Sequence, residues 1–249
     1  MMDANRPAMR NGLVAGGLGI LIGGGAVALW AGGEGAGGDR GKGEIEQIVR
    51  GYILEHPEIL QEASVRLQQR ESGRAVEANR AAFEVPFAGA WAGAADGDVT
   101  LVEFFDYACG YCRKSNADVD RLLREDPKLK VVWRDWPVLG PDSERAALVS
   151  LAAARQGVYR QFFDQLFAAG RPTPAALQRA QQAVGVSPQA VAQLQASPEA
   201  RAELTRNYQL AQSIGATGTP TFVVGDQVLQ GAVGYDALKK AVAEARSGA

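Results

Sequence analysis

Two cysteines separated by two residues are the side chains of this sequence with the clearest chemical potential. Cys109 and Cys112 lie in the stretch LVEFFDYACGYCRK and are the only cysteines among the 249 residues. The apolar run from Leu101 to Phe105 predicts a buried strand that leads into a helix beginning at the first cysteine. A thiol at a helix N-terminus is stabilised as a thiolate by unpaired backbone N–H groups and by the macrodipole. The pattern therefore predicts an attacking thiol at Cys109 and, one helical turn later, a resolving thiol at Cys112.

A CxxC pair has other possible uses, which the rest of the composition narrows. An intramolecular zinc site needs further ligands, and this chain has no third cysteine and a single histidine, His56. We therefore predict no zinc site, and we interpret His56 as a helix-boundary residue. A disulfide between adjacent helical turns closes too short a loop to stabilise the chain much. Two adjacent thiolates can bind Cu(I), so copper binding or protection against copper stress is the alternative to redox chemistry.

Length and charge limit the remaining functional classes. The chain can hold one good-sized domain with additional segments. Its 26 Lys and Arg residues nearly balance 28 Asp and Glu residues, and the net charge is −2. This balance provides no long-range field to attract nucleic acid. We predict no nucleic-acid partner and no cofactor.

The first 33 residues have the pattern of an export signal. Arg6 and Arg10 precede an uncharged run from Asn11 to Gly33. Basic residues before an apolar run keep that end in the cytoplasm, so the rest of the chain would lie outside it. The run is long enough for a membrane span, but its many glycines lower its hydrophobicity. An uncleaved anchor over residues 12–33 and a cleaved signal peptide therefore remain equal alternatives.

Two segments separate this signal from the cysteine-containing domain. The Gly-rich residues 34–43 predict a flexible linker. Residues 44–80 follow as an N-terminal helical segment, in which isoleucine, valine and tyrosine recur at helical spacing and a break is expected at His56-Pro57. Such an apolar stripe needs a partner. Its coiled-coil-like spacing favours self-association through residues 44–70 over packing against its own domain.

The remaining residues, 98–249, predict an α/β domain. A strand from Val99 to Phe105 and the CxxC helix are followed by a second strand from Leu129 to Trp136. A helical insertion over about 141–215, a hairpin and a final helix complete the order. Cys112 should face the core while Cys109 stays at the exposed helix tip. This order is that of a thioredoxin-like fold with an inserted helical subdomain, preceded by an N-terminal helical segment.

Local signals place the ends of several elements. Three N-cap residues followed by proline should begin helices of the insertion, namely Thr173-Pro174, Ser187-Pro188 and Ser197-Pro198. Gly225-Asp226 is a turn signal between two short apolar runs and predicts the hairpin. Residues 71–97 show little periodicity apart from Phe83, Phe87 and Trp91.

Several motifs of this sequence resemble the DsbA-like thiol:disulfide oxidoreductases, and within them the ScsC-type branch. FFDYACGYC is similar to the branch's active-site strand and turn, and GDVTLVEFF, WPVLGP and GTPTFVVG match in order and spacing. IEQIVRGYILEHPEIL resembles the branch's oligomerisation segment. The resemblance implies an enzyme that forms, isomerises or reduces disulfides in exported proteins, with a membrane redox partner of the DsbB or DsbD type. It would act on the periplasmic side of the inner membrane, anchored or released.

The resemblance also implies roles for residues outside the cysteine pair. Glu103 matches the family's buried acid, whose raised pKa would let it exchange a proton with Cys112; without the resemblance it would be a strand glutamate near a sheet edge. Thr219-Pro220 matches the loop whose proline is cis. The backbone of Thr219 would pair there with an extended substrate peptide.

The two residues between the cysteines depart from the best-known oxidases of the family, which have a histidine there. Gly110 and Tyr111 occupy these positions and would contribute to substrate binding. Because tyrosine carries no positive charge, the pKa of Cys109 should be lowered less than in a histidine-containing motif. Arg113 and Lys114 could replace part of that charge. This departure and the helical segment favour isomerase or reductase activity slightly over oxidase activity, and the direction stays open.

Overall fold

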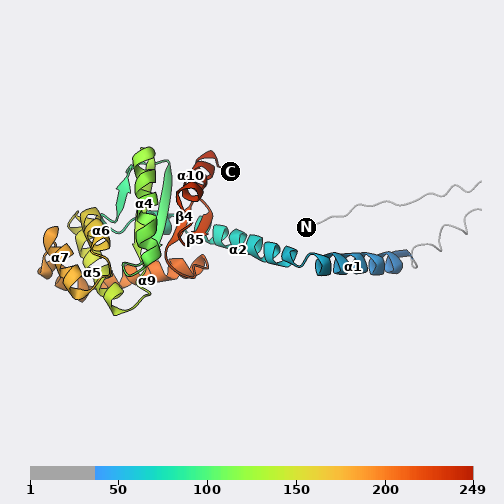
Figure 1. Ribbon diagram of the computed structural model, residues 1–249, viewed down its shortest axis with the longest axis horizontal. Helices are drawn as coiled ribbons and strands as arrows, with labels where there is room; N and C mark the ends of the chain where they lie inside the picture. The colour runs from blue at the N-terminus through green and yellow to red at the C-terminus, as the bar shows by residue number, and fades with distance from the viewer. Residues whose placement is uncertain (1–36, 249) are drawn as a thin grey trace, which may run out of the picture. The chain divides into compact units, whose positions relative to one another are not determined.

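The computed structural model describes residues 37–248, which form two compact units divided after Leu60. Figure 1 shows the elements of both units. The predicted signal or anchor, residues 1–33, lies outside the described residues. Within residues 37–248, no helix has both the length and the apolar character needed to cross a membrane.

The first unit contains helix α1 (Gly37–Glu55) and the beginning of helix α2 (Glu58–Ala78). The predicted break is confirmed, because α1 ends before His56 and α2 begins after Pro57. The predicted linker is wrong over residues 37–43, which are helical. Extending an existing helix gains one hydrogen bond for each residue fixed, and the i,i+4 pair Lys42–Glu46 (4.0 Å) lies on this first part of α1.

The second unit is built on a five-stranded sheet of order β1-β3-β2-β4-β5. Its strands are β1 (Trp91–Gly93), β2 (Val99–Phe105), β3 (Leu129–Asp135), β4 (Thr221–Val224) and β5 (Gln227–Gln230). Strands β2 and β3 are parallel, and the other neighbouring pairs are antiparallel. The thioredoxin-like sheet, its central strand β2 and the hairpin are therefore confirmed.

Both faces of the sheet are covered, because successive strand residues point to opposite sides. Leu101 and Phe105 of β2 pack with residues of α4 (Gly110–Glu125) and α10 (Tyr235–Ser247). Val102 and Phe104 belong to a second cluster, which includes residues of α2, α3 (Arg80–Glu84) and α9 (Pro198–Ser213). Every residue of β2 after Thr100 is buried, as the continuous apolar run predicted.

The predicted insertion consists of five helices between β3 and β4. They are α5 (Pro141–Arg155), α6 (Tyr159–Ala168), α7 (Pro174–Ala183), α8 (Pro188–Ala196) and α9. Thr173 and Ser187 cap their helices, accepting hydrogen bonds from the backbone N–H groups of Ala176 and Ala190 at 3.2 and 3.0 Å. The predicted side-chain cap at Ser197 is wrong. Because α8 ends one residue earlier, the Ser197 hydroxyl donates back to the Leu194 carbonyl at 2.7 Å.

Two short elements follow α2 without a signal in the sequence pattern. Helix α2 continues to Ala78, within the predicted helical segment of residues 44–80, and α3 and β1 lie after it. Elements of five and three residues are too short to show a period. At the end of β1, Gly93 has a positive φ of 91°, and a side chain there would clash with the Leu129 carbonyl oxygen.

A buried arginine holds three of these segments together. Arg134 of β3 is 1% exposed, and its Nη1 donates to Glu203 Oε1 and Asn207 Oδ1 of α9, both at 3.0 Å. Its remaining N–H groups donate to the backbone carbonyls of Ala82, Phe83 and Val85. The guanidinium therefore fixes α3 and the residues after it against the sheet.

We expect Arg134→Ala to lower the free energy of unfolding by roughly 3–5 kcal/mol, because it leaves the buried Glu203 carboxylate without its main partner. Arg145→Ala is the matched control. It removes an exposed pair with Asp142 and should cost less than about 1 kcal/mol. Denaturant unfolding of both variants measures the difference, and equal small losses would contradict this role of Arg134.

Candidate active site

The first cysteine lies at the N-cap of α4, where the chain leaves the central strand. After β2 ends at Phe105, a short turn brings Cys109 to extended backbone angles (φ −77°, ψ 118°), and its N–H donates to the Asp106 carbonyl at 3.0 Å. The Cys112 backbone N–H donates to the Cys109 sulfur at 3.3 Å. The sulfur thus receives one of the N–H groups that a helix N-terminus leaves unpaired.

Asp106, which the sequence analysis did not select, fixes this turn. Its Oδ1 accepts hydrogen bonds from the Ala108 N–H (2.7 Å) and the Ser143 hydroxyl (2.6 Å). Its Oδ2 accepts from the backbone N–H groups of Val138 and Leu139, both at 2.9 Å. With four donors on one carboxylate, the turn before Cys109 is tied to the loop between β3 and α5. An aspartate directly after a strand is the signal of an Asx-turn that could have identified it.

The prediction that Cys109 stays at an exposed tip is wrong. The residue is 6% exposed, because the loop at Thr219-Pro220 covers it. The peptide bond of this pair is cis, as the resemblance implied. In its protonated form, the Cys109 thiol donates to the Thr219 carbonyl oxygen at 3.2 Å. Cys112 is fully buried, as predicted.

The two thiols have opposite acid–base properties. A hydrogen bond from the Cys112 thiol is the main cause that lowers the pKa of Cys109 to about 5, against the opposing effect of burial. Backbone N–H groups of Cys112 and Tyr111 add to this lowering. Burial raises the pKa of Cys112, and the hydrogen bond to Cys109 and the charge of Glu103 act in the same direction. At neutral pH the site therefore holds one thiolate and one thiol.

Glu103 lies in the middle of β2 and is fully buried, so it is not near a sheet edge. Burial raises its pKa to about 8, while a hydrogen bond from Trp133 Nε1 to Oε2 (3.0 Å) opposes this shift. The other carboxyl oxygen, Oε1, has no partner among the described residues. Trp133 is the directly paired residue of the neighbouring strand. In the sequence, Trp133 has the usual signature of a core strand residue, so nothing there signals its contact with Glu103.

The residues around the cysteines form an open surface. A side chain at Gly110 would meet no atom within 4 Å, and Tyr111 is 70% exposed. The sequence suggested that the positive charge of Arg113 could help to stabilise the Cys109 thiolate. In the structure, Arg113 binds other groups. Its guanidinium donates to the carbonyls of Phe167 (3.2 Å) and Gly170 (2.7 Å), at the C-terminal end of α6. Arg113 thus connects the active-site helix to the insertion.

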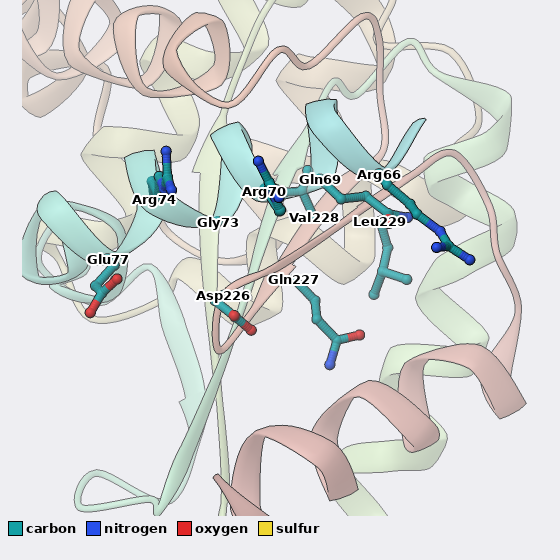
Figure 2. A pocket seen from close by; sticks show the side chains of 10 residues that line it. All are labelled: Arg66, Gln69, Arg70, Gly73, Arg74, Glu77, Asp226, Gln227, Val228 and Leu229. Atoms are coloured by element: carbon teal, nitrogen blue, oxygen red, sulfur yellow. The ribbon is translucent and has the colours of Figure 1, made fainter. Parts of the chain in front are cut away.

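Features away from the cysteines do not resemble a second catalytic centre. His56, between α1 and α2, is exposed and contacts Glu58 at 3.3 Å. Among residues 37–248, no three His, Cys, Asp or Glu side chains are placed to hold a metal ion. A cavity of about 630 Å³ lies between α2 and the β4–β5 turn (Figure 2). Neither cysteine lines it, so the thiols do not act inside this cavity.

Comparison with known protein families gives two matches. Residues 100–243 match the DSBA-like thioredoxin domain, and residues 42–72 match the copper resistance protein ScsC N-terminal domain. The first match covers the sheet except β1 and the first residue of β2, and it includes both cysteines and the whole insertion. The second covers α1 from Lys42 and most of α2.

Solved structures with this fold agree with the family matches. A thioredoxin-like oxidoreductase from Silicibacter pomeroyi is 38% identical over 69% of this chain and 99% of its own, with a TM-score of 0.65. Proteus mirabilis ScsC in a transitional conformation is 25% identical over 84% of this chain and 96% of its own, with a TM-score of 0.63. A periplasmic thioredoxin-like protein from Salmonella enterica is 27% identical over 68% of this chain and 95% of its own, with a TM-score of 0.61.

Curated relatives match over a part of their length. The Na⁺/H⁺ antiporter NhaA 3 of Salinispora tropica is 29% identical over 156 residues, which are 61% of this chain and 24% of the antiporter. The chain thus spans about a quarter of the length of the curated relatives it matches.

The raised pKa of Glu103 predicts how stability depends on pH. In the oxidised protein neither thiol titrates and Cys109 no longer raises the pKa of Glu103, but burial, the main cause, still keeps this pKa above 4.5, near which the unfolded chain releases the proton. The contribution of Glu103 is therefore full below about pH 4.5 and falls by up to about 1.4 kcal/mol for each pH unit until the pH reaches the pKa of the folded state.

Glu103→Gln removes this titration and keeps an oxygen that can accept from Trp133. We expect the free energy of unfolding of the variant, relative to wild type, to rise as the pH increases above about 5. Denaturant unfolding of the two oxidised proteins gives the difference at each pH. Parallel curves would show that Glu103 is not titrating in a buried site.

Proposed function

Since this chain belongs to the DSBA-like thioredoxin domain family, we propose that it exchanges disulfides with exported proteins through Cys109 and Cys112. The chain is a thiol–disulfide oxidoreductase. The observation that carries the proposal is the arrangement of its two sulfurs. Cys109 receives the Cys112 N–H at 3.3 Å with its pKa lowered to about 5, while the pKa of Cys112 is raised beside the buried acid.

The first step is attack of the Cys109 thiolate on a client disulfide. A bond forms between the Cys109 sulfur and one client sulfur, and the other client sulfur leaves as a thiolate. Because its pKa is about 5, Cys109 is ionised at neutral pH and needs no base for this step. The Thr219 carbonyl, 3.2 Å from the sulfur, lies where an extended client backbone can pair with it.

The second step needs a base, because the Cys112 thiol is protonated at neutral pH. Because the pKa of Glu103 is about 8, most of this acid is protonated at neutral pH, and its minor carboxylate form takes this proton at the free oxygen. Cys112 then attacks the Cys109 sulfur. The bond to the client breaks, and the second client thiolate leaves. The client gains two electrons and the Cys109–Cys112 pair loses two. The reverse sequence transfers the disulfide to a dithiol client.

Tyr111, Val138 and Leu139 provide an apolar surface beside these thiols. Their exposed fractions are 70%, 42% and 54%. Asp106 holds the backbone of Val138 and Leu139 next to the turn that precedes Cys109. Such exposed apolar groups suit an unfolded or extended protein client better than a small molecule, which needs a concave pocket.

The acidity of Cys109 lies between two reference cases. Its pKa of about 5 is above that of the strong oxidant DsbA, about 3.5, and below that of thioredoxin, about 7. No histidine lies between the cysteines to lower the pKa of Cys109 further. The charge of Arg113 does not replace it, since Arg113 binds the end of α6. We propose isomerase or reductase activity as the main direction.

Two observations support our proposal for the site of action. The basic residues before the apolar run of residues 11–33 predict export, and one similar structure is a periplasmic thioredoxin-like protein. We place the enzyme on the periplasmic side of the inner membrane, anchored by residues 12–33 or released. A membrane partner of the DsbB or DsbD type would restore its redox state there.

Copper binding is the second candidate function. It is favoured by the match of residues 42–72 to a domain named for copper resistance and by two sulfurs of one helical turn. A Cu(I) ion would need both thiolates at once. The raised pKa of Cys112 opposes this, because its sulfur is protonated at neutral pH.

Single cysteine variants distinguish these two functions. Cys109→Ala should abolish attack on a disulfide-containing client, because it removes the thiolate. Cys112→Ala should instead accumulate a mixed disulfide between Cys109 and the client, because it removes the resolving thiol. Non-reducing electrophoresis with a disulfide-containing client measures both outcomes. Equal, mild losses in the two variants, together with Cu(I) binding that requires both cysteines, would favour the copper function.

The helical segment supports self-association through residues 44–70. Five apolar side chains of α1 are exposed by half or more: Ile45, Ile48, Val49, Tyr52 and Leu54. A helix with such a surface gains stability when a second copy covers it. Several active sites held together would suit an isomerase, because one client could meet more than one Cys109.

We expect Ile48→Glu to shift the protein from an oligomer toward a monomer, because it places a charge on the apolar stripe. Arg50→Glu, two residues away, is the matched control and should leave the oligomer intact. Sedimentation of full-length protein measures the mass of both variants. A monomeric wild type, or equal effects of the two substitutions, would contradict self-association through this stripe.

A further inference from the structure

A continuous series of contacts leads from the buried acid Glu103 to the protein surface. Trp133 donates its Nε1 hydrogen to Glu103 Oε2 at 3.0 Å. The guanidinium carbon of Arg160, on α6, lies 5.1 Å from the centre of the Trp133 ring, a cation–π contact. Arg160 in turn pairs with Asp120 of α4 at 2.6 Å. Each link in this series joins a different element.

Exposure rises along the same series. Glu103 and Trp133 are 0% and 2% exposed, whereas the side chains of Arg160 and Asp120 are 28% and 33% exposed. Asp164, one turn further along α6, also pairs with Arg160 at 2.8 Å. The arginine is thus held by two carboxylates on one side and by an aromatic ring on the other. It occupies the boundary between solvent and the layer that contains Glu103.

The charged and titratable groups that face Glu103 come from three elements. The N-terminal part of α4 contributes Cys109 and Cys112, and α4 also contributes Asp120. Helix α6 contributes Arg160 and Tyr159, and β3 contributes the uncharged donor Trp133. Asp120 and Arg160 act in opposite directions: the carboxylate raises the pKa of Glu103, and the guanidinium lowers it.

We propose that Arg160 is a positioning residue for Glu103, and that its pairing with Asp120 sets how readily this buried acid exchanges its proton during thiol exchange. This inference rests on the proposed role of Glu103 as the acceptor of the Cys112 proton. Because Arg160 belongs to α6 and Asp120 to α4, the packing of the insertion against the active-site helix determines the balance of charge at Glu103. The insertion would then regulate the second step of exchange and not the first.

The test is a carbon NMR titration of the Glu103 carboxyl group in the oxidised, full-length protein. Arg160→Met should raise the titration midpoint, because the Asp120 charge is left uncompensated. Asp120→Asn should lower it. The double variant should return close to the wild-type value, and Arg160→Lys should lie nearer to wild type than Arg160→Met. Arg121→Met is the matched control, since Arg121 also pairs on α4 and stacks on an aromatic ring, that of Tyr235; it should cause no shift.

Shifts of the Glu103 midpoint in opposite directions in Arg160→Met and Asp120→Asn would show that the two residues act through their charges. A mere loss of packing would not give shifts of opposite sign. Midpoints unchanged in both single variants, or shifted in the same direction, would overturn the inference. A second measurement separates it from the proposed function: the pH dependence of mixed-disulfide resolution by Cys112 should move in the direction of the Glu103 midpoint in each variant. Shifted midpoints with an unmoved resolution profile would reject the role of Glu103 in exchange, while loss of resolution in wild type would reject the proposed function itself.

Discussion

The burial of one carboxyl group in the central strand is the constraint on which the rest of the structure depends. Glu103 is fully buried, and Trp133 gives it a single hydrogen bond. Such a group is stable only in its neutral form, unless a neighbour supplies or removes charge. Helices on both faces maintain this burial, and α4 places the thiols above it. The acid therefore joins the architecture of the sheet to the chemistry of the cysteines.

Local sequence signals were sufficient for the elements around the site. Continuous apolar residues gave the bounds of β2, the Gly225-Asp226 turn gave the hairpin, and CxxC after a strand gave the start of α4. The shielding of Cys109 could not be predicted in the same way. It depends on the Thr219 carbonyl, 110 positions away in the chain, and no periodicity encodes a contact of that separation.

Polar residues with several partners were the least predictable part of the site. Asp106 and Arg134 each bind groups from distant segments, and only the folded chain brings those groups together. For Arg113, the sequence suggested a partner that the structure does not show. Its charge suggested a role at the thiolate, but the open carbonyls at the end of α6 are nearer partners for its guanidinium. The type of a side chain was evident from the sequence, whereas its partner was not.

Asp106 holds the neighbouring loop by its backbone, so the position of the turn before Cys109 does not depend on which side chains the loop carries. The carboxylate binds the backbone N–H groups of Val138 and Leu139 and leaves both side chains exposed. Because every non-proline residue has such an N–H group, the side chains can change without loosening the turn before Cys109. Under the client binding that we propose for these side chains, substitutions at Val138 and Leu139 change the preference for clients and leave the thiol reactivity unchanged.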